Sequence, residues 1–589
     1  MRKGFTLIEL LAVITILALV ALITSISVAN MVKESKDELS DAQIKSIELA
    51  AKAWGADNIT LLPSGDSCSF ITLKDLKENG LLDSNISNPK DKEELSNDLK
   101  IKITSKLNSK GKSILTYEVN SSSVGNCSYI GNPIYVDVPK GLTPVVYDGK
   151  NWKVPELNQE WYNYDKQMWA NAVVLGKGKT KQPGEIVTVE GENPDALMML
   201  VYIPRYEYKI EGDFGKGGQS EDLPGEIEVN FIGKNTTTAT EGYHIHPAFN
   251  FDGEKSGFWV GKFELSHETL SSSTTDNNLG CSSTSCANAS GLRILPNKES
   301  LRYNNVSNFW YGIKSIENTQ TFGLNNMDTH MMKNSEWGAV AYLSQSKYGK
   351  YGNNDYVKGV QKEVYKNNSS KYYTGRSGGN PAGRTPINGT YTDQTSTYQY
   401  NNYGFYTYDG YLLSYNTNNK TETRDINKGT GASTTGNIYG VYDMSGGAYE
   451  YVMGAYGDSQ GIYSGYSAAS NSGFNGRTGN DNGNVTNGVQ VPDSKYYDIY
   501  ANPTNVSNND GSLSCNNGIC YGHGISEING STTNTGWYGD YATVVTSIHP
   551  WFLRGGNYDT YASAGVFGHD GDHGRCYGSV SARVVGFVK

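Results

Sequence analysis

Apolar residues run almost without interruption from Phe5 to about Val28. A helix of this length rises about 36 Å at about 1.5 Å per residue, which exceeds the roughly 30 Å hydrocarbon core of a bilayer. Arg2 and Lys3 precede the run, so the positive-inside bias keeps the N-terminus in the cytoplasm. We therefore predict one membrane span, with the rest of the chain outside the cytoplasm.

Beyond the span the apolar positions keep a helical spacing, and we expect one long helix that ends near Gly55. Residues 71–82 then predict a short helix. The alternating segments 99–104 and 114–119 predict a small antiparallel sheet. The first part of the chain is therefore expected to be a long helix with a small head.

The chain has 589 residues, which suggests about four domain-sized units. Only 19% of the residues are charged, while 68 Gly and 43 Tyr contribute much of the remainder. This composition favours a loop-rich extracytoplasmic protein, and the 11% aromatic content argues against disorder. The net charge of −10 argues against binding to nucleic acid, because phosphate binding needs a basic surface.

The segment Arg2-Lys-Gly-Phe-Thr-Leu-Ile-Glu9 resembles the type IV prepilin signal. The resemblance implies cleavage by prepilin peptidase between Gly4 and Phe5, with methylation of the new Phe5 amine. It also implies that Glu9, which would be costly unpaired in lipid, accepts the Phe5 amine of a neighbouring pilin subunit. The protein would then lie in the membrane before assembly and in a surface pilus afterwards. A plain membrane anchor with a chance glutamate is the alternative.

Seven cysteines are present, and an exported chain normally pairs an even number of them. Cys68 and Cys127 lie at either end of the head, where a disulfide would stabilise a small core. The closely spaced pairs Cys281/Cys286 and Cys515/Cys520 predict local loop disulfides, with zinc binding as the competing interpretation. Cys576 is left over.

Prolines and glycines after the head predict a linker. The expected division is a leader at 1–4, a pilin-like helix and head at 5–130, a linker at 131–143 and a large exported module at 144–589.

Four segments of the large module resemble, in order and chemistry, the formylglycine-generating enzyme family, which has an irregular C-type-lectin-like fold. They begin at Gly257, Asn334, Tyr439 and Leu553, and the most specific is Tyr439-Gly-Val-Tyr-Asp-Met-Ser-Gly-Gly-Ala-Tyr-Glu-Tyr-Val. The resemblance spans about residues 257–589 and implies an α+β fold. Enzymes of this family need a thiol pair after the Arg-Gly-Gly segment to hold copper, and residues 557–564 contain no cysteine. We therefore expect a non-catalytic module.

The same resemblance implies a calcium site, because the family binds calcium through the segment equivalent to residues 443–450. The residues carried over are Asp443, Gly446, Ala448 and Glu450. Carboxylate and carbonyl oxygens are the ligands that calcium selects. The alternative is that Asp443 and Glu450 only brace a buried turn.

The final loops, Asn557 to Gly578, combine aromatic rings with small polar residues and glycine, as paratopes do. They also resemble the C-terminal segment that some lectin-fold proteins diversify for ligand choice. The predicted ligand-binding residues are Tyr558, Tyr561, His569, Asp570, His573 and Tyr577. The alternative is that the rings close the core. A further pair, His244 and His246, has the strand spacing that a metal pair would require, but the adjacent Pro247 and the lack of a nearby carboxylate favour a structural edge.

These patterns together predict a minor type IV pilin or pseudopilin that displays an adhesin-like module for a surface glycan or protein ligand. Two alternatives remain, a membrane-anchored surface enzyme and a secretion-system pseudopilin.

Overall fold

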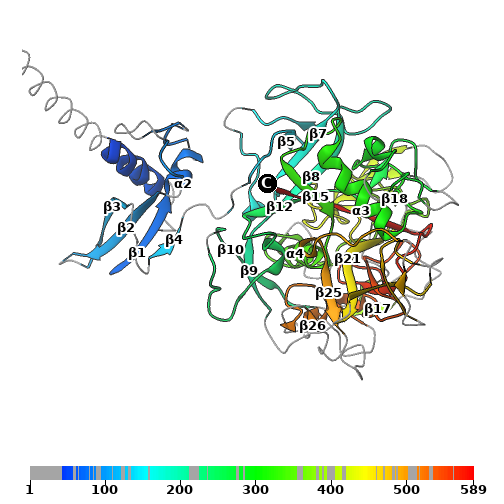
Figure 1. Ribbon diagram of the computed structural model, residues 1–589. Coiled ribbons are helices and arrows are strands. Elements are labelled where there is room, and N and C mark those ends of the chain that lie inside the picture. The colour runs from blue at the N-terminus through cyan, green and yellow to red at the C-terminus, as the bar shows by residue number, and fades with distance from the viewer. Residues whose placement is uncertain are drawn as a thin grey trace, which may run out of the picture. The chain divides into compact units, whose positions relative to one another are not determined.

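The structure is a computed structural model, and the chain divides into two compact units, Met1–Pro133 and Ile134–Lys589 (Figure 1). The class is mixed α and β, with more strand than helix, in line with the α+β prediction. The residues described are 43–589, without 57–61, 64, 79, 84, 88–93, 98, 109–110, 121–126, 131–133, 135, 157–158, 211–223, 235, 273–276, 283–284, 354–361, 380–383, 388–389, 394–404, 414–419, 459–460, 468–470, 480–483, 486–487, 502–513, 516–517, 529–534 and 561–562.

The predicted membrane span, residues 5–28, lies outside the described residues. Within the described part of the chain, no helix is long and apolar enough to cross a membrane.

The first unit contains a helix over residues 43–56 and a four-stranded sheet in the order β3-β2-β1-β4. The strands are β1 (Ser67–Thr72), β2 (Lys100–Leu107), β3 (Ser113–Asn120) and β4 (Ser128–Tyr129), and α2 (Leu73–Glu78) follows β1. The first three strands pair antiparallel, as the alternating pattern predicts. The short strand β4 pairs parallel to β1, so the sheet is mixed and not purely antiparallel.

The helix of the first unit packs through one apolar stripe. Its buried residues are Ile47, Ala50, Ala51 and Trp54, whose spacing of three and four places them on one face. They share a core with the inward residues of the sheet, including Ile71, Ile101 and Ile103. The apolar face of the helix and the apolar face of the sheet therefore form one small core.

The second unit is built on a seven-stranded sheet in the order β15-β31-β12-β8-β7-β5-β6. Its strands are β5 (Leu142–Tyr147), β6 (Trp152–Lys153), β7 (Asn171–Leu175), β8 (Ala196–Pro204), β12 (Gly257–Gly261), β15 (Met327–Met331) and β31 (Val584–Val588). The first strand of the unit and the last strand of the chain thus belong to one sheet.

A second, ten-stranded sheet surrounds β21 (Tyr449–Asp458). Its other strands are β22 (Gly461–Gly465), β23 (Gly476–Thr478), β24 (Asn484–Val485), β25 (Asp498–Ala501), β26 (Ser514–Cys515), β27 (Gly518–Ile519), β28 (Trp551–Arg554), β29 (His569–Asp572) and β30 (Val580–Ala582). Smaller sheets are formed by β9 (Tyr206–Ile210), β10 (Ile227–Phe231) and β11 (His244–Ile245), by β13 (Ser266–His267) and β14 (Leu292–Arg293), by β16 (Arg384–Ile387) and β17 (Thr390–Asp393), and by β18 (Phe405–Tyr406), β19 (Tyr411–Leu413) and β20 (Lys420–Arg424).

Three helices complete the described part of the second unit: α3 (Val306–Lys314), α4 (Asn334–Ser344) and α5 (Ile426–Thr430). Every residue of α4 is buried. Gly338 lets this helix approach a loop, because a Cβ there would lie 1.9 Å from the carbonyl oxygen of Gly522. The close approach holds residues 521–523 against the helix.

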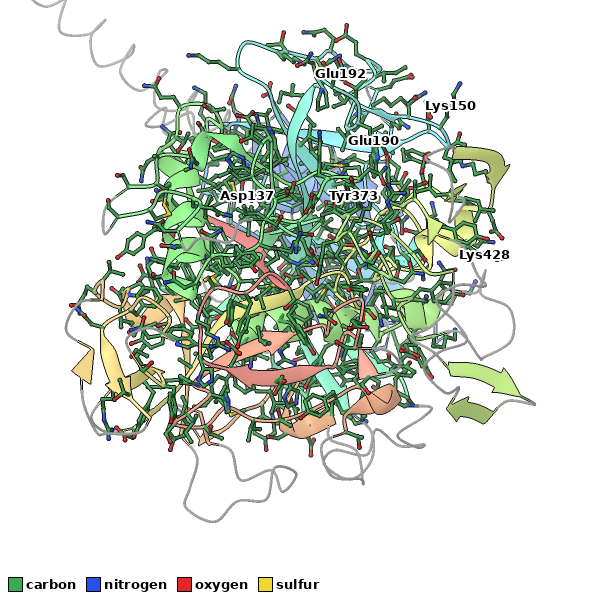
Figure 2. All side chains as sticks on the ribbon, turned by 90° about the vertical axis from the view of Figure 1, so that its right-hand side faces the viewer. Asp137, Lys150, Glu190, Glu192, Tyr373 and Lys428 are labelled. Carbon is green, nitrogen blue, oxygen red and sulfur yellow. A yellow bond between two sulfur atoms is a disulfide. The ribbon has the colours of Figure 1, made fainter. Side chains whose placement is uncertain are left out.

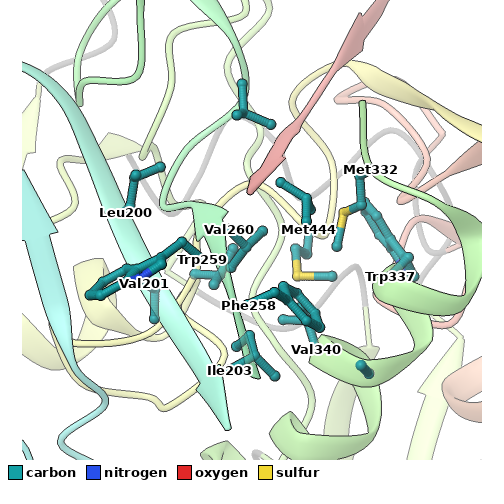
Figure 3. Packing of buried hydrophobic residues seen from close by; sticks show 14 of the residues in the cluster. Leu200, Val201, Ile203, Phe258, Trp259, Val260, Met332, Trp337, Val340 and Met444 are labelled. Atoms are coloured by element: carbon teal, nitrogen blue, oxygen red, sulfur yellow. The ribbon is translucent and has the colours of Figure 1, made fainter. Parts of the chain in front are cut away.

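The core of the second unit lies between β8, β12 and α4 (Figure 3). Phe258 and Val260 of β12 and Ile203 of β8 face Val340 and Trp337 of the helix side in the close-up. Each such side chain contributes about 1.5–3 kcal/mol when it is fully buried. Charged side chains such as Lys150, Glu192 and Lys428 lie instead at the periphery of this unit (Figure 2).

Most of the predicted linker, residues 131–143, belongs to the second unit. The division between the units falls at Pro133 and Ile134. Val136 and Leu142 are buried in the core of the second unit, and the Tyr162 hydroxyl donates to the Ile134 carbonyl at 3.0 Å. The second unit therefore begins earlier than the predicted residue 144, because the apolar residues of this stretch are anchored.

Two of the predicted disulfides are confirmed, Cys68–Cys127 and Cys281–Cys286. Cys520 is also disulfide-bonded, while the side chain of Cys515 lies outside the described part. Cys576 is a half-buried thiol.

The Cys68–Cys127 disulfide closes a loop with a sequence separation of 59 residues. We expect replacement of both cysteines by serine to lower the free energy of unfolding of the first unit by roughly 4 kcal/mol, through the entropy of the open loop. Hydrogen exchange of β2 in the full-length protein would measure this loss. Replacing Cys281 and Cys286, which are separated by 5 residues in the other unit, is the control and should leave β2 protection unchanged. Equal protection of β2 in both variants would contradict the prediction.

Candidate functional site

The predicted processing and assembly residues, Gly4, Phe5 and Glu9, lie outside the described residues. The other predicted sites lie in the second unit, and their geometry is described first.

The turn that carries the predicted calcium ligands is buried. Asp443 has a φ of 64°, which is unusual for a residue with a side chain, and its carboxylate compensates by accepting several hydrogen bonds. The donors are the Asn367 side-chain amide at 2.8 Å and the Gly375 backbone amide at 2.8 and 3.0 Å. Asp443 therefore holds residues 367–375 against the turn.

Glu450, at the start of β21, is paired with a cation. Arg583 Nε donates to one carboxylate oxygen at 2.9 Å, and Arg583 Nη2 donates to the other. Arg583 also donates to the backbone carbonyls of Gly261 and Tyr442, at 2.8 and 2.9 Å. The guanidinium thereby joins β12, the turn and β21.

A third carboxylate that the sequence analysis did not single out, Glu264, completes this network. It accepts the Ala448 backbone amide at 2.9 Å and the Ser300 hydroxyl. Gly447 is required beside it, because a Cβ there would lie 2.5 Å from a Glu264 oxygen. Burial, together with the charges of Asp443 and Glu450, raises the pKa of Glu264 well above its usual value.

These contacts bear on the calcium prediction. Both oxygens of Glu450 face Arg583, and both oxygens of Asp443 face N–H donors. A calcium ion would have to displace these donors and would meet the guanidinium charge. Among the described residues, no cluster of three or more His, Cys, Asp or Glu side chains has the placement of a metal site. The residues fit an internal hydrogen-bond network better than a calcium shell.

The predicted ligand-binding residues of the final loops differ in their exposure. Tyr558, Asp570, His573 and Tyr577 are half-buried, and Tyr561 lies outside the described residues. His573 packs against His549, with ring centroids 4.5 Å apart. The Tyr558 ring packs edge-on against Tyr372, with centroids 5.1 Å apart.

His569 is buried, whereas it was predicted to lie in an exposed ligand-binding loop. It is 3% exposed, lies opposite Arg554 in the pairing of β28 with β29, and its Nδ1 is 2.6 Å from the Thr543 carbonyl oxygen. Burial, aided by the Arg554 charge, lowers its pKa to about 3. This neutral imidazole therefore belongs to the core and not to an exposed surface, because the segment that looked like a loop pairs as a strand.

A cleft of about 670 Å³ provides a different candidate site. Four separate segments contribute to its wall: residues 243–247 around β11, the N-terminal end of α4, residues 494–499 and residues 521–523. His244 and His246 are both at this place. His244 is exposed at the cleft, whereas His246 is buried and its Nδ1 accepts the Ala248 backbone amide at 3.3 Å.

Two polar side chains at the N-terminal end of α4, Lys333 and Ser335, line the cleft and have no side-chain hydrogen bond within the described part of the chain. Lys333 is 6% exposed, and its ammonium lies 5.7 Å from the ring centroid of Phe251. Ser335 is 1% exposed, and its hydroxyl has no partner. Nothing in the local sequence indicates this role, because the other parts of the wall are distant in sequence.

Comparison with known proteins identifies the N-terminus. Residues 1–25 match the family model described as the prokaryotic N-terminal methylation motif. No curated protein matches the chain. The match supports the predicted type IV pilin-like N-terminus, and with it the expected partnership with prepilin peptidase and other pilin subunits.

The carboxylate network predicts a pH dependence. The pKa of Glu264 is raised above its ordinary value of 4.5, so the folded state binds more protons than the unfolded state above that pH. Stability must then fall as the pH rises from about 4.5 through the folded pKa, by about 1.4 kcal/mol for each pH unit between the unfolded and folded pKa values. We expect Glu264→Gln to remove this part of the decline. Denaturant unfolding of both proteins at pH 5 and pH 8 measures it, and parallel pH profiles would contradict it.

The same network predicts the response to calcium. Because the oxygens of Asp443 and Glu450 already accept protein hydrogen bonds, we expect the same melting temperature in chelator and in millimolar calcium. A bound ion would instead stabilise the fold by about 2.7 kcal/mol at a hundredfold excess over Kd. A calcium-dependent rise that Asp443→Asn abolishes would establish the site that the sequence resemblance implies.

Proposed function

We propose that the protein is a minor type IV pilin or pseudopilin that displays a large, non-catalytic, adhesin-like module at the cell surface. The observation that carries this proposal is the N-terminal methylation motif at residues 1–25, followed by a small unit whose helix packs on a sheet. The larger unit, Ile134–Lys589, is the module to be displayed.

The size of the second unit favours a minor subunit of the filament over a major one. The second unit contains more than three times as many residues as the first. If every subunit of a filament carried it, the modules would crowd one another around the helical core. A sparse or terminal position in the filament avoids this crowding.

The C-type-lectin-like, formylglycine-generating-enzyme-like nature of the module is part of the proposal. Its support is the order of the four sequence segments and the long irregular connections between short strands. Loss of catalysis is proposed because residues 557–564, after Arg554-Gly-Gly, contain no thiol pair for copper. Oxygen consumption by the copper-loaded protein with a cysteine peptide would favour the enzyme alternative.

The pilin assignment predicts the chemistry of the N-terminus. Mass spectrometry of the mature protein should find N-methylated Phe5 as the first residue. Glu9→Gln should reduce incorporation into sheared surface fibres by at least tenfold, because the charged Phe5 amine of the neighbouring subunit would lose the carboxylate that compensates it in lipid. Glu118→Gln, at an exposed position of β3, is the matched control and should incorporate normally.

An uncut Met1, or normal incorporation of the Glu9 variant, would contradict the proposal. Cleavage after Gly4 without any protein in sheared fibres would favour the secretion-system pseudopilin.

A further inference from the structure

The cleft near α4 is lined by a largely buried lysine, Lys333, whose ammonium makes no hydrogen bond or ion pair among the described residues. An ammonium withdrawn from water is costly unless an acceptor or a counter-charge replaces the lost hydration. The Lys333 ammonium has the Phe251 ring at 5.7 Å, a contact worth only about 0.5–2 kcal/mol. The fold therefore maintains a cation at the cleft wall that an anion from outside would stabilise.

The end of α4 adds to this preference. Lys333 immediately precedes the helix, so its ammonium stands near the N-terminal pole, where the backbone dipoles favour negative charge. The Ser335 hydroxyl in the first turn supplies a second donor without a partner. The Ser335 backbone amide is already bonded to Asp498 Oδ2, at 2.7 Å. The side chains of Lys333 and Ser335, and not that amide, thus remain without a hydrogen-bond partner.

His523 lies on the same wall. Burial raises the pKa of Tyr500 well above its usual value, so its hydroxyl keeps its proton. That hydroxyl accepts from the Asn334 amide at 2.7 Å and lies 2.6 Å from His523 Nδ1, to which it donates. Burial also lowers the pKa of His523. The neutral ring therefore carries its proton on Nε2, as a hydrogen-bond donor.

The cleft also has an aromatic side. The rings of His244 and Tyr521 stack with centroids 4.2 Å apart and an interplanar angle of 17°. Both residues line the cleft, and His244 is exposed. A stacked pair of this kind presents a flat apolar face, on which the C–H face of a sugar ring can lie.

Acidic residues in the cleft limit the charge of a ligand. Asp498 and Glu254 are both part of the wall. Glu254 is paired with Arg205, and Lys495, which also lines the cleft, is paired with Asp328 at 3.1 Å. Lys333 and Asp498 therefore set the charge that a ligand meets, and a single carboxylate can face Lys333 while a hydroxyl group donates to Asp498. A volume of about 670 Å³ is within the range of small-ligand pockets.

We propose that this cleft binds a sugar acid, a saccharide unit that carries one carboxylate. The carboxylate is held by Lys333 Nζ and Ser335 Oγ, and the ring lies on the His244–Tyr521 stack. This inference rests on the proposed display role, for which it names the class of ligand.

Calorimetric titration of the full-length protein in detergent tests the site, with glucuronic acid and N-acetylneuraminic acid as probes and glucose and acetate as controls. We expect at least one acid to bind at least tenfold more tightly than glucose and acetate. Lys333→Gln should weaken that binding at least tenfold, and Ser335→Ala about threefold or more. Lys428→Gln, at an exposed lysine, should bind as the wild type does.

Stability separates a binding role from a structural one. Lys333→Gln removes an ammonium that is costly in the free protein, so its melting temperature should equal or exceed that of the wild type while binding is lost. If this variant does not fold, Tyr521→Ala carries the test through the loss of ring stacking, with a fivefold or greater loss of affinity expected.

The inference is overturned if neither acid binds, if acetate binds as tightly as the acids, or if the Lys333 and Ser335 variants bind unchanged. Incorporation of the same variants into sheared fibres depends on the N-terminus and not on the cleft. Normal incorporation without sugar-acid binding would overturn this inference alone, whereas failure of the wild type to enter fibres would overturn the proposed pilin role.

Discussion

The buried ion pair between Arg583 and Glu450 joins the two large sheets of the second unit. Arg583 is the single residue between β30, in the ten-stranded sheet, and β31, in the seven-stranded sheet. Its guanidinium donates to Glu450 of β21 and to the Gly261 carbonyl of β12, so one side chain bonds to a strand of each sheet. Removing one partner of such a pair costs about 3–5 kcal/mol, because the other charge stays buried and uncompensated. The relative position of the two sheets thus depends on the hydrogen bonds of the Arg583 guanidinium. These bonds are directional, whereas hydrophobic packing is not.

The turn at residues 443–450 follows from this constraint. Asp443 adopts a left-handed backbone conformation, and Gly447 leaves room for Glu264, so three carboxylates lie at the turn. The charge of Arg583 acts on two of them, Asp443 and Glu450. Burial raises the pKa values of Glu264, Asp443 and Glu450, and the charges of neighbouring carboxylates add to the rise for Glu264 and Glu450. Acidic residues in a tight turn resemble a cation site in sequence, yet here the compensating cation is a side chain of the same chain.

Local patterns allowed the first unit to be predicted well. The helical stripe that ends at Trp54, the alternation of Ile101 with Ile103 and the Cys68–Cys127 disulfide follow from periodicity and spacing, which act over a few residues or through one covalent constraint. The second unit was harder, because its strands are short and their partners are distant in sequence. His569 illustrates this: glycine and aspartate around it resemble a loop, and only the pairing of β29 with β28 buries it.

The cleft could not be predicted for the same physical reason. Its wall unites residues near 244, 333, 498 and 523, and no local pattern reports that these segments converge. Lys333 before an apolar helix looks like an ordinary solvated lysine. Its significance arises only when α4 is drawn into the core through Gly338 and the loop at Gly522 closes over the helix. A helix that is buried along its whole length cannot leave its N-terminal end to bulk water, so the lysine that precedes it is enclosed as well. The packing that stabilises the core thereby places an unpaired cation at one edge of the cleft, and this cation is what the proposed sugar-acid ligand would meet.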